Sequence, residues 1–391
     1  MTRSVAVGTK FMLENNAAAI LTHLRKARRE SVSAIAKETG LSRQAVSRSL
    51  AVLESMGLVE ISAPDRAASP AGRPPQMVRF RAEAGHVLSV DINPGAARLV
   101  VADLAGDFVT DVSAQLGRSG PRALADSLHR AVERALDDAG VQPDGIWHAT
   151  ASAPGIVDPA TGHVSLSPSM PEMVGDAIAA GIRAAGISAP VHVDNDVKLA
   201  TEGERWRGTP HAEDSLVFVD WGERIGAGIV LHGELYRGAS NDAGDLGYLD
   251  LLAPTTPGEG DLGPFERWVG TRELLRLSGR RTALPELAEA ARQGEEWALS
   301  AIHEIATRFA RGVAAIRALL DPEVIVIGGD IADLGPVLVD AVVDALVSQE
   351  LNQPRLELST LGVDAIVHGA IRHSLSWVER ERFDARAIRS T

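Results

Sequence analysis

The chain has 391 residues, of which 45% are hydrophobic and 23% charged, as expected of a globular protein with two or three domains. It contains no cysteine, which excludes disulfides and thiolate zinc sites, and no apolar run approaching the roughly 18 residues of a membrane span. We expect no targeting segment and no membrane partner, and this composition fits a cytoplasmic location.

Charge is distributed unevenly along the chain, whose net charge is −13. Residues 1–83 carry 13 Lys and Arg against 7 Asp and Glu, a net charge of +6, so the remainder carries −19. A small basic module on an acidic body predicts that only the module contacts a polyanion.

The start of the chain predicts three helices. Apolar residues within Asn16–Arg28 follow the spacing of an amphipathic helix. Ser31 is placed to cap a short second helix that ends at Gly40. Ser42 is placed to cap a third helix, Arg43–Met56. Two short helices joined by a glycine-containing turn indicate a helix-turn-helix.

Residues 58–61 and 77–81 predict the two strands of a wing, so residues 1–81 are expected to form a winged helix-turn-helix domain. Arg73 lies in Gly-Arg-Pro, where prolines would extend the backbone and present the guanidinium to a minor groove. A stiff linker is the alternative for this segment, and an exposed polar face is the alternative for the third helix. The predicted DNA-contacting residues are Ser42, Arg43, Gln44, Ser47, Arg48 and Arg73.

Residues 82–86 are expected to be a linker, and residues 87–391 a large α/β domain of two lobes. A strand at Val87–Asp91 is followed by a turn and a returning strand, Arg98–Leu104. The same arrangement of residues recurs at Val217–Asp220, so Asp91 and Asp220 occupy equivalent positions in two copies. A duplicated unit predicts two lobes with a cleft between them. Further helices are expected at 121–139, 197–207 and 295–319, and further strands at 146–151, 191–196 and within 321–330.

The stretch 218–248 is the most specific in the chain. Gly222, Gly226 and Gly228 separate two apolar strands; they would permit positive φ and close approach of a ligand, or belong to an ordinary hairpin turn. The two strands are followed by Leu-Tyr-Arg-Gly-Ala and Ala-Gly-Asp-Leu-Gly. With these motifs, the whole stretch resembles the signature of the ROK family of repressors, open reading frames and sugar kinases. The resemblance extends from about Val87 to Ser376. The N-terminal module resembles that of ROK repressors of the xylose and N-acetylglucosamine type.

The resemblance implies an actin-like ATPase (ribonuclease H-like) sugar-kinase fold, duplicated as described above. In ROK kinases an Asn-Asp pair binds the sugar, and Asn195 and Asp196 match it. The family's Ala-Gly-Glu…Gly-His becomes Ala-Gly-Asp…Gly-Tyr here, and a further sugar-contacting Glu aligns with Glu266. A relic cleft without ligand is the alternative. The implied sugar-binding residues are Asn195, Asp196, Asp245, Tyr248 and Glu266.

Other family features are altered. The cysteines of the family's zinc loop are absent from residues 257–264 and Tyr248 replaces its His, so no metal is expected. Pro94 replaces an amide donor at the first phosphate turn. At the second phosphate turn, the carboxylate of Glu223 would repel a triphosphate, and Arg224 would partly offset this repulsion. We favour a packing role for the Gly328–Gly329 pair. These changes predict no catalytic residues, no cofactor and no enzymatic activity.

The sequence therefore predicts a transcriptional regulator, most simply a repressor of carbohydrate metabolism genes. Its partners would be a double-stranded DNA operator, a sugar effector bound by the inactive kinase-like domain, and a second copy in a homodimer or dimer of dimers. Two alternatives stay open. One is an active sugar kinase with a fused DNA-binding module, and the other is a DNA-binding protein whose large domain is only a dimerisation scaffold.

Overall fold

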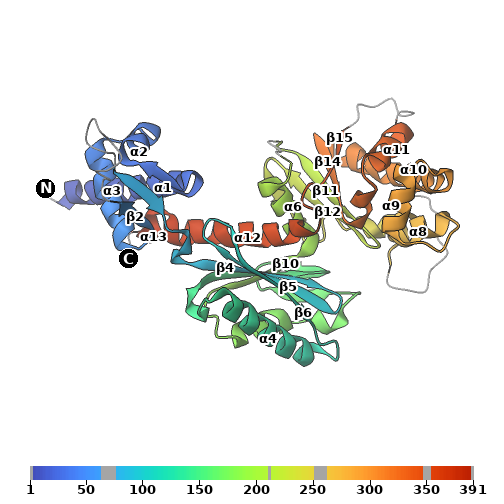
Figure 1. Cartoon of the computed structure of the whole chain (residues 1–391), viewed down its shortest axis with the longest axis horizontal. Helices are drawn as coiled ribbons and strands as arrows, with labels where there is room; N and C mark the ends of the chain where they lie inside the picture. Colours follow the sequence, from blue (N-terminus) through green and yellow to red (C-terminus); the bar gives the residue numbers. More distant parts are fainter. Residues whose placement is uncertain (1–2, 63–75, 210–212, 251–261, 347–353, 389–391) are drawn as a thin grey trace.

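The computed structural model describes residues 3–62, 76–209, 213–250, 262–346 and 354–388. The N-terminal module, the first lobe and the second lobe follow one another along the longest axis of the molecule (Figure 1). No helix in the described ranges is long and apolar enough to cross a membrane.

The N-terminal module is a winged helix-turn-helix, as predicted. Its Ser31 and Ser42 hydroxyls accept hydrogen bonds from the Ala34 and Ala45 N–H groups at 3.1 and 3.2 Å, so both predicted caps are confirmed. The first helix is longer than predicted, and an unpredicted strand pairs with the wing to give the order β1-β3-β2. The elements are α1 (Arg3–Ala27), β1 (Arg29–Ser31), α2 (Val32–Thr39), α3 (Arg43–Ser55), β2 (Val59–Ser62) and β3 (Met77–Phe80).

Two five-stranded sheets with the same topology confirm the predicted duplication. In each, the first three strands form an antiparallel meander, and the fourth and fifth join parallel to the first. The first sheet has the order β10-β7-β4-β5-β6 and the second β13-β12-β11-β14-β15. The first consists of β4 (His86–Asn93), β5 (Ala96–Asp103), β6 (Phe108–Gln115), β7 (Ile146–Ala153) and β10 (Val191–Asn195). The second consists of β11 (Leu216–Trp221), β12 (Ile225–Leu231), β13 (Glu234–Tyr236), β14 (Val324–Gly328) and β15 (Arg355–Leu358).

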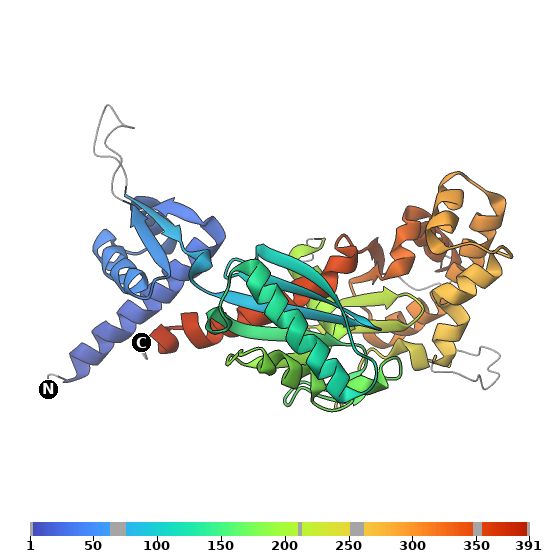
Figure 2. The same ribbon diagram turned by 60° about the horizontal axis from the view of Figure 1, so that its bottom comes forward.

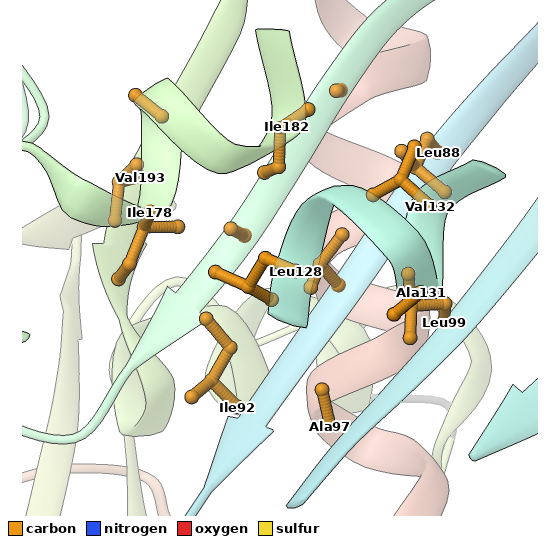
Figure 3. Packing of buried hydrophobic residues seen from close by; sticks show 14 of the residues in the cluster. Leu88, Ile92, Ala97, Leu99, Leu128, Ala131, Val132, Ile178, Ile182 and Val193 are labelled. Carbon is orange, nitrogen blue, oxygen red and sulfur yellow. The ribbon is translucent and has the colours of Figure 1, made fainter. Parts of the chain in front are cut away.

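In the first lobe, alternation along the strands divides the side chains between two faces. Leu88 and Leu99 face the helices α4 (Pro121–Ala139) and α5 (Ala177–Ala184), where they pack with Leu128 and Ile182 (Figure 3). On the opposite face, Val87 and Val100 belong to a separate core with α12 (Ala365–Val378). A small hairpin, β8 (Ile156–Asp158) with β9 (His163–Leu166), completes the lobe.

In the second lobe the outer face of the sheet carries most of the helices. Trp221 stacks on Phe309 there, with ring centroids 3.7 Å apart. The inner face packs against α6 (Asp196–Arg207) and the start of α12. The outer helices are α7 (Pro264–Val269), α8 (Thr271–Leu277), α9 (Leu284–Arg292), α10 (Glu296–Leu320) and α11 (Pro336–Leu346).

Helices α6 and α12 pack together between the two sheets (Figure 1). Glycines allow the close approach: a Cβ at Gly203 would lie 2.0 Å from the Ala365 carbonyl oxygen, and one at Gly369 1.7 Å from that of Leu199. The pair therefore mechanically connects the lobes.

The C-terminal segment returns to the N-terminal module. We had expected all residues after the linker at 82–86 to belong to the large domain alone. After α12, a π-helical turn (Glu379–Phe383) and α13 (Ala385–Ile388) pack against α1 (Figures 1 and 2). Arg25 of α1 forms an ion pair with Glu379 at 2.7 Å and lies over the Phe383 ring. The expected linker is also shorter, since residues 82–84 form a 3₁₀ turn and His86 already belongs to β4.

Candidate functional site

The carboxyl end of β10, the loop after β7 and the turns of the second lobe enclose a cavity of about 270 Å³. This volume is just below the usual range of ligand pockets, roughly 300–1,000 Å³, and suits a small molecule. All five residues predicted to bind sugar line it. The structure thus brings them together, and sugar binding by them stays a prediction.

Asn195 and Asp196 lie at the junction of β10 and α6, because the side chain of Asn195 caps the helix. Asn195 Oδ1 accepts from the Lys198 N–H at 3.1 Å, and Nδ2 donates to the Gly155 carbonyl at 3.0 Å. Asn195 therefore fixes the loop after β7 as well as facing the cavity. Asp196 Oδ1 accepts from the Val197 N–H at 2.8 Å.

Asp196 lines the cavity, and its carboxyl group is close enough to those of Asp220 and Asp91 to be repelled by them. Burial, followed by repulsion from Asp220 and Asp91, raises the pKa of Asp196 to about 7. Burial, followed by repulsion from Asp330 and Asp91, raises the pKa of Asp220 to about 6. Asp91 accepts a 2.8 Å hydrogen bond from Ser152. Within the described ranges, no group of three or more His, Asp or Glu side chains could hold a metal ion.

The remaining predicted residues differ in exposure. Glu266 is buried, and its two oxygens accept from the Ile225 and Gly263 N–H groups at 3.1 and 2.7 Å. It therefore anchors α7 to β12. Burial and the neighbouring Glu266 raise the pKa of Asp245, whereas Tyr248 lies at the rim and is 55% exposed.

A polar network next to these residues was missed by the sequence reasoning. Lys198 Nζ donates to the Asn241 carbonyl, and Asn241 Oδ1 accepts from Arg237 at 3.2 Å. Arg237 also makes a bidentate ion pair with Asp194, at 2.9 and 2.6 Å. One signal was available: Lys198 lies in the first turn of the predicted helix, three residues after Asn195, which the family resemblance had already placed at the sugar.

The glycines of the characteristic stretch have a different role from the one predicted. None of Gly222, Gly226 and Gly228 takes a positive φ. A Cβ at Gly226 would lie 2.9 Å from Val197, and one at Gly228 1.7 Å from the Thr201 hydroxyl. Gly226 and Gly228 therefore admit helix α6, and only Gly226 also lines the cavity.

Of the two turns equivalent to phosphate-binding turns, the first contains a proline and the second makes contacts within the protein. Pro94 lies in the turn between β4 and β5, and Gly222 accepts from the Thr271 N–H at 3.0 Å. Glu223 forms an ion pair with Arg272. At the end of β14, a Cβ at Gly328 would lie 2.5 Å from the Phe218 ring, in agreement with the predicted packing role. Residues 257–261, where the family's zinc loop was expected, lie outside the described residues.

The predicted DNA-binding face is the exposed side of α3. Ser42, Arg43, Gln44, Ser47 and Arg48 are all exposed there. Ser42 is occupied as the helix cap, and the Ser47 hydroxyl donates to the Arg43 carbonyl at 3.0 Å. Considering only the residues that the structure describes, neither Arg43 nor Arg48 forms an ion pair, so both guanidinium groups are free for phosphates or base edges. Arg73 lies outside the described residues.

Comparison with known proteins agrees with this architecture. The ROK family model matches residues 87–374, which is well over half of the chain, and the MarR family model matches residues 13–68. The chain belongs to the ROK family. A crystal structure of a ROK family transcriptional regulator, described as a homolog of the E. coli MLC protein, has 20% identity and a TM-score of 0.76. The match covers 97% of this chain and 98% of that one.

Both branches of the ROK family occur among the relatives. The xylose repressor of Caldicellulosiruptor bescii is 23% identical over 333 residues, which is 79% of this chain and 82% of the repressor. The glucokinase of Thermotoga maritima is 28% identical over 242 residues, which is 56% of this chain and 76% of the kinase. The match with the ROK family transcriptional regulator covers 97% of this chain, so it includes most of the N-terminal module.

Proposed function

We propose that this ROK protein is a DNA-binding transcriptional regulator, a repressor of carbohydrate metabolism genes, whose large domain senses a sugar without phosphorylating it. One observation carries the proposal: a winged helix with free arginines on α3 is joined to a domain in which the five expected sugar-binding residues surround one cavity. Under this proposal residues 1–81 bind DNA and residues 87–391 sense the sugar, with the protein acting in the cytoplasm.

Helix α6 supports communication between cavity and DNA module. It begins at Asp196 on the cavity and, over 12 residues or about 18 Å, ends at Arg207. Arg207 donates to the Gly106 carbonyl at 2.9 Å and lies 3.6 Å from Asp107. Asp107 also pairs with Arg28 of the module at 3.2 Å. A sugar that favours one position of α6 would therefore favour one position of the module.

A homodimer completes the proposal. Two recognition helices related by a two-fold axis match palindromic half-sites one or more helical turns apart, and a dimer of dimers would bind two such sites. Ligand coupling of about 1–3 kcal/mol, or roughly 5- to 150-fold in DNA affinity, is typical of such regulators.

The test is a titration of D-xylose and D-glucose into the complex of the full-length protein with DNA from upstream of its own gene. Fluorescence anisotropy should show DNA binding that a sugar alters at least fivefold. Binding that neither these nor other monosaccharides alter would favour the scaffold alternative, in which the large domain only dimerises.

The alternative that the protein is an active sugar kinase is tested by an assay of ADP release from ATP. Pro94 and the carboxylate of Glu223 occupy the two phosphate turns, so we expect no sugar-dependent release of ADP from ATP. The kinase relatives make this assay necessary. Turnover above that of an Asp196→Ala variant would establish that the domain is an active kinase.

A further inference from the structure

Lys198 is a buried cation on the wall of the cavity. It occupies the third position of α6, and its side chain is only 5% exposed. Its Nζ donates to the Asn241 carbonyl, the one hydrogen bond that this ammonium makes within the described part of the chain. An ammonium group has three donor protons, so two are left for a ligand.

Two effects oppose a cation at this position. Burial disfavours the charged form and lowers the pKa of Lys198. The N-terminal turn of a helix also carries partial positive charge, which disfavours a second positive charge nearby. A well-packed apolar residue would be at least as stable there. A costly charge that faces a cavity is typical of a ligand-binding site.

The position of the ammonium is fixed by its acceptor. Asn241 has a positive φ of 66° and is buried, and its Nδ2 donates to the Val157 carbonyl at 2.6 Å. Its Oδ1 accepts from Arg237, which Asp194 holds in a bidentate ion pair. The carbonyl that binds Lys198 is therefore rigid, and the two remaining donor protons have a restricted direction.

The charges around the cavity favour an uncharged ligand group. Asp194 already neutralises Arg237. Asp242 and Asp245 line the same cavity as Lys198, and both attract its positive charge. An anionic ligand would be brought close to these carboxylates. A hydroxyl accepts one hydrogen bond while donating another, so it can satisfy an ammonium and a carboxylate together.

We propose that Lys198 is a specificity-determining residue of the cavity. It donates a hydrogen bond to one hydroxyl of an uncharged sugar, and Asp245 accepts the proton of the same hydroxyl. This inference rests on the proposed sugar-sensing function and adds to it the residue that recognises that hydroxyl.

Isothermal titration calorimetry on the full-length protein tests it. Whichever of D-glucose and D-xylose binds wild type more tightly is compared with its monodeoxy derivatives and with D-glucuronate. In wild type, one deoxy derivative should bind about 10- to 100-fold more weakly than the parent sugar, because a charged donor loses its acceptor. Lys198→Met should lower the affinity for the parent sugar by a similar factor. The affinity for the weakly bound deoxy derivative should stay as in wild type.

Lys37→Met is the matched control, because Lys37 is exposed on α2, and it should leave sugar affinity unchanged. Circular dichroism checks that each variant is folded. If Lys198→Met does not fold, Lys198→Gln replaces it. An amide keeps two donor protons, so this variant should lose less affinity for the parent sugar and show the same dependence on the one hydroxyl.

Three results would overturn the inference. An equal loss for the parent sugar and every deoxy derivative would mean that Lys198 only shapes the cavity. Tighter binding of glucuronate than of glucose, abolished in Lys198→Met, would make Lys198 an anion receptor. No binding of any monosaccharide by wild type would refute sugar sensing itself, and this result is recognised before any variant is made.

Discussion

At the scale of single residues, the carboxyl group of Asp196 on the cavity makes stability depend on pH. Asp196 has its pKa raised from 3.8 to about 7, chiefly by burial. The folded chain therefore binds this proton more tightly than the unfolded chain, and the free energy of unfolding falls as pH rises from about 4 through about 7. Asp196→Asn removes the ionisation, so we expect it to exceed wild type in stability at pH 8 by on the order of 1–3 kcal/mol.

Urea unfolding between pH 4 and pH 8 measures this difference, which should vanish near pH 4. Asp137→Asn, at an exposed carboxyl on α4, is the control and should follow the wild-type profile. A constant difference between Asp196→Asn and wild type at every pH would show that ionisation is not its cause. The same variant should keep DNA binding and lose much of the response to sugar, because a charged acceptor is removed from the cavity.

Arg48 on α3 is the residue at which DNA binding is most directly tested. Its exposed guanidinium forms no ion pair within the described ranges, so it is available to a phosphate. Arg48→Ala should weaken DNA binding and reduce the slope of log affinity against log salt by about 1. Anisotropy titrations at several salt concentrations measure the slope. Arg122→Ala removes an exposed positive charge far along the chain on α4, and an equal effect there would refute a specific contact.

At the scale of elements, the contact between α6 and α12 depends on two glycines. A Cβ at position 369 would lie 1.7 Å from the backbone oxygen of Leu199, which no side-chain rotation can relieve. Gly369→Ala should therefore destabilise the fold by about 1–3 kcal/mol or more through overpacking. Gly222→Ala is the matched control, since a Cβ there has no contact below 3.7 Å. Equal unfolding midpoints for the two variants would contradict this view of the helix pair.

At the scale of the whole molecule, the C-terminal segment holds the DNA module against the rest of the chain. Phe383 is 6% exposed and lies beneath Arg25 of α1. Phe383→Ala should release the module, because a large apolar contact worth roughly 3–5 kcal/mol is removed. Limited proteolysis should then cut faster near residues 82–86, and sugar affinity should stay unchanged. Leu319→Ala, at an 82% exposed position, controls for the loss of an apolar side chain and should be cut at the wild-type rate.

Much of this fold was predictable because its signals are local. The caps at Ser31 and Ser42 act on amides three residues away, and apolar periodicity marks α4 with the bounds observed. The duplication was visible because two apolar segments of similar sequence carry equivalent aspartates, Asp91 and Asp220. Asn195 ends strand β10 and faces the cleft, as polar residues at strand ends of α/β folds do. The other four candidate sugar residues were identified by family resemblance, and they line the same cavity.

Only the tertiary structure decided the partners of several residues, because those partners are distant in sequence and leave no periodic pattern. Lys198 meets the carbonyl of Asn241, 43 residues away, and its role in the cavity follows from that contact. The sequence predicted that Gly228 lies in a turn or faces a ligand. In the structure, the absence of a Cβ at Gly228 makes room for Thr201. The return of residues 379–388 to α1 was likewise invisible, since an amphipathic segment shows which of its faces is buried and not what covers it.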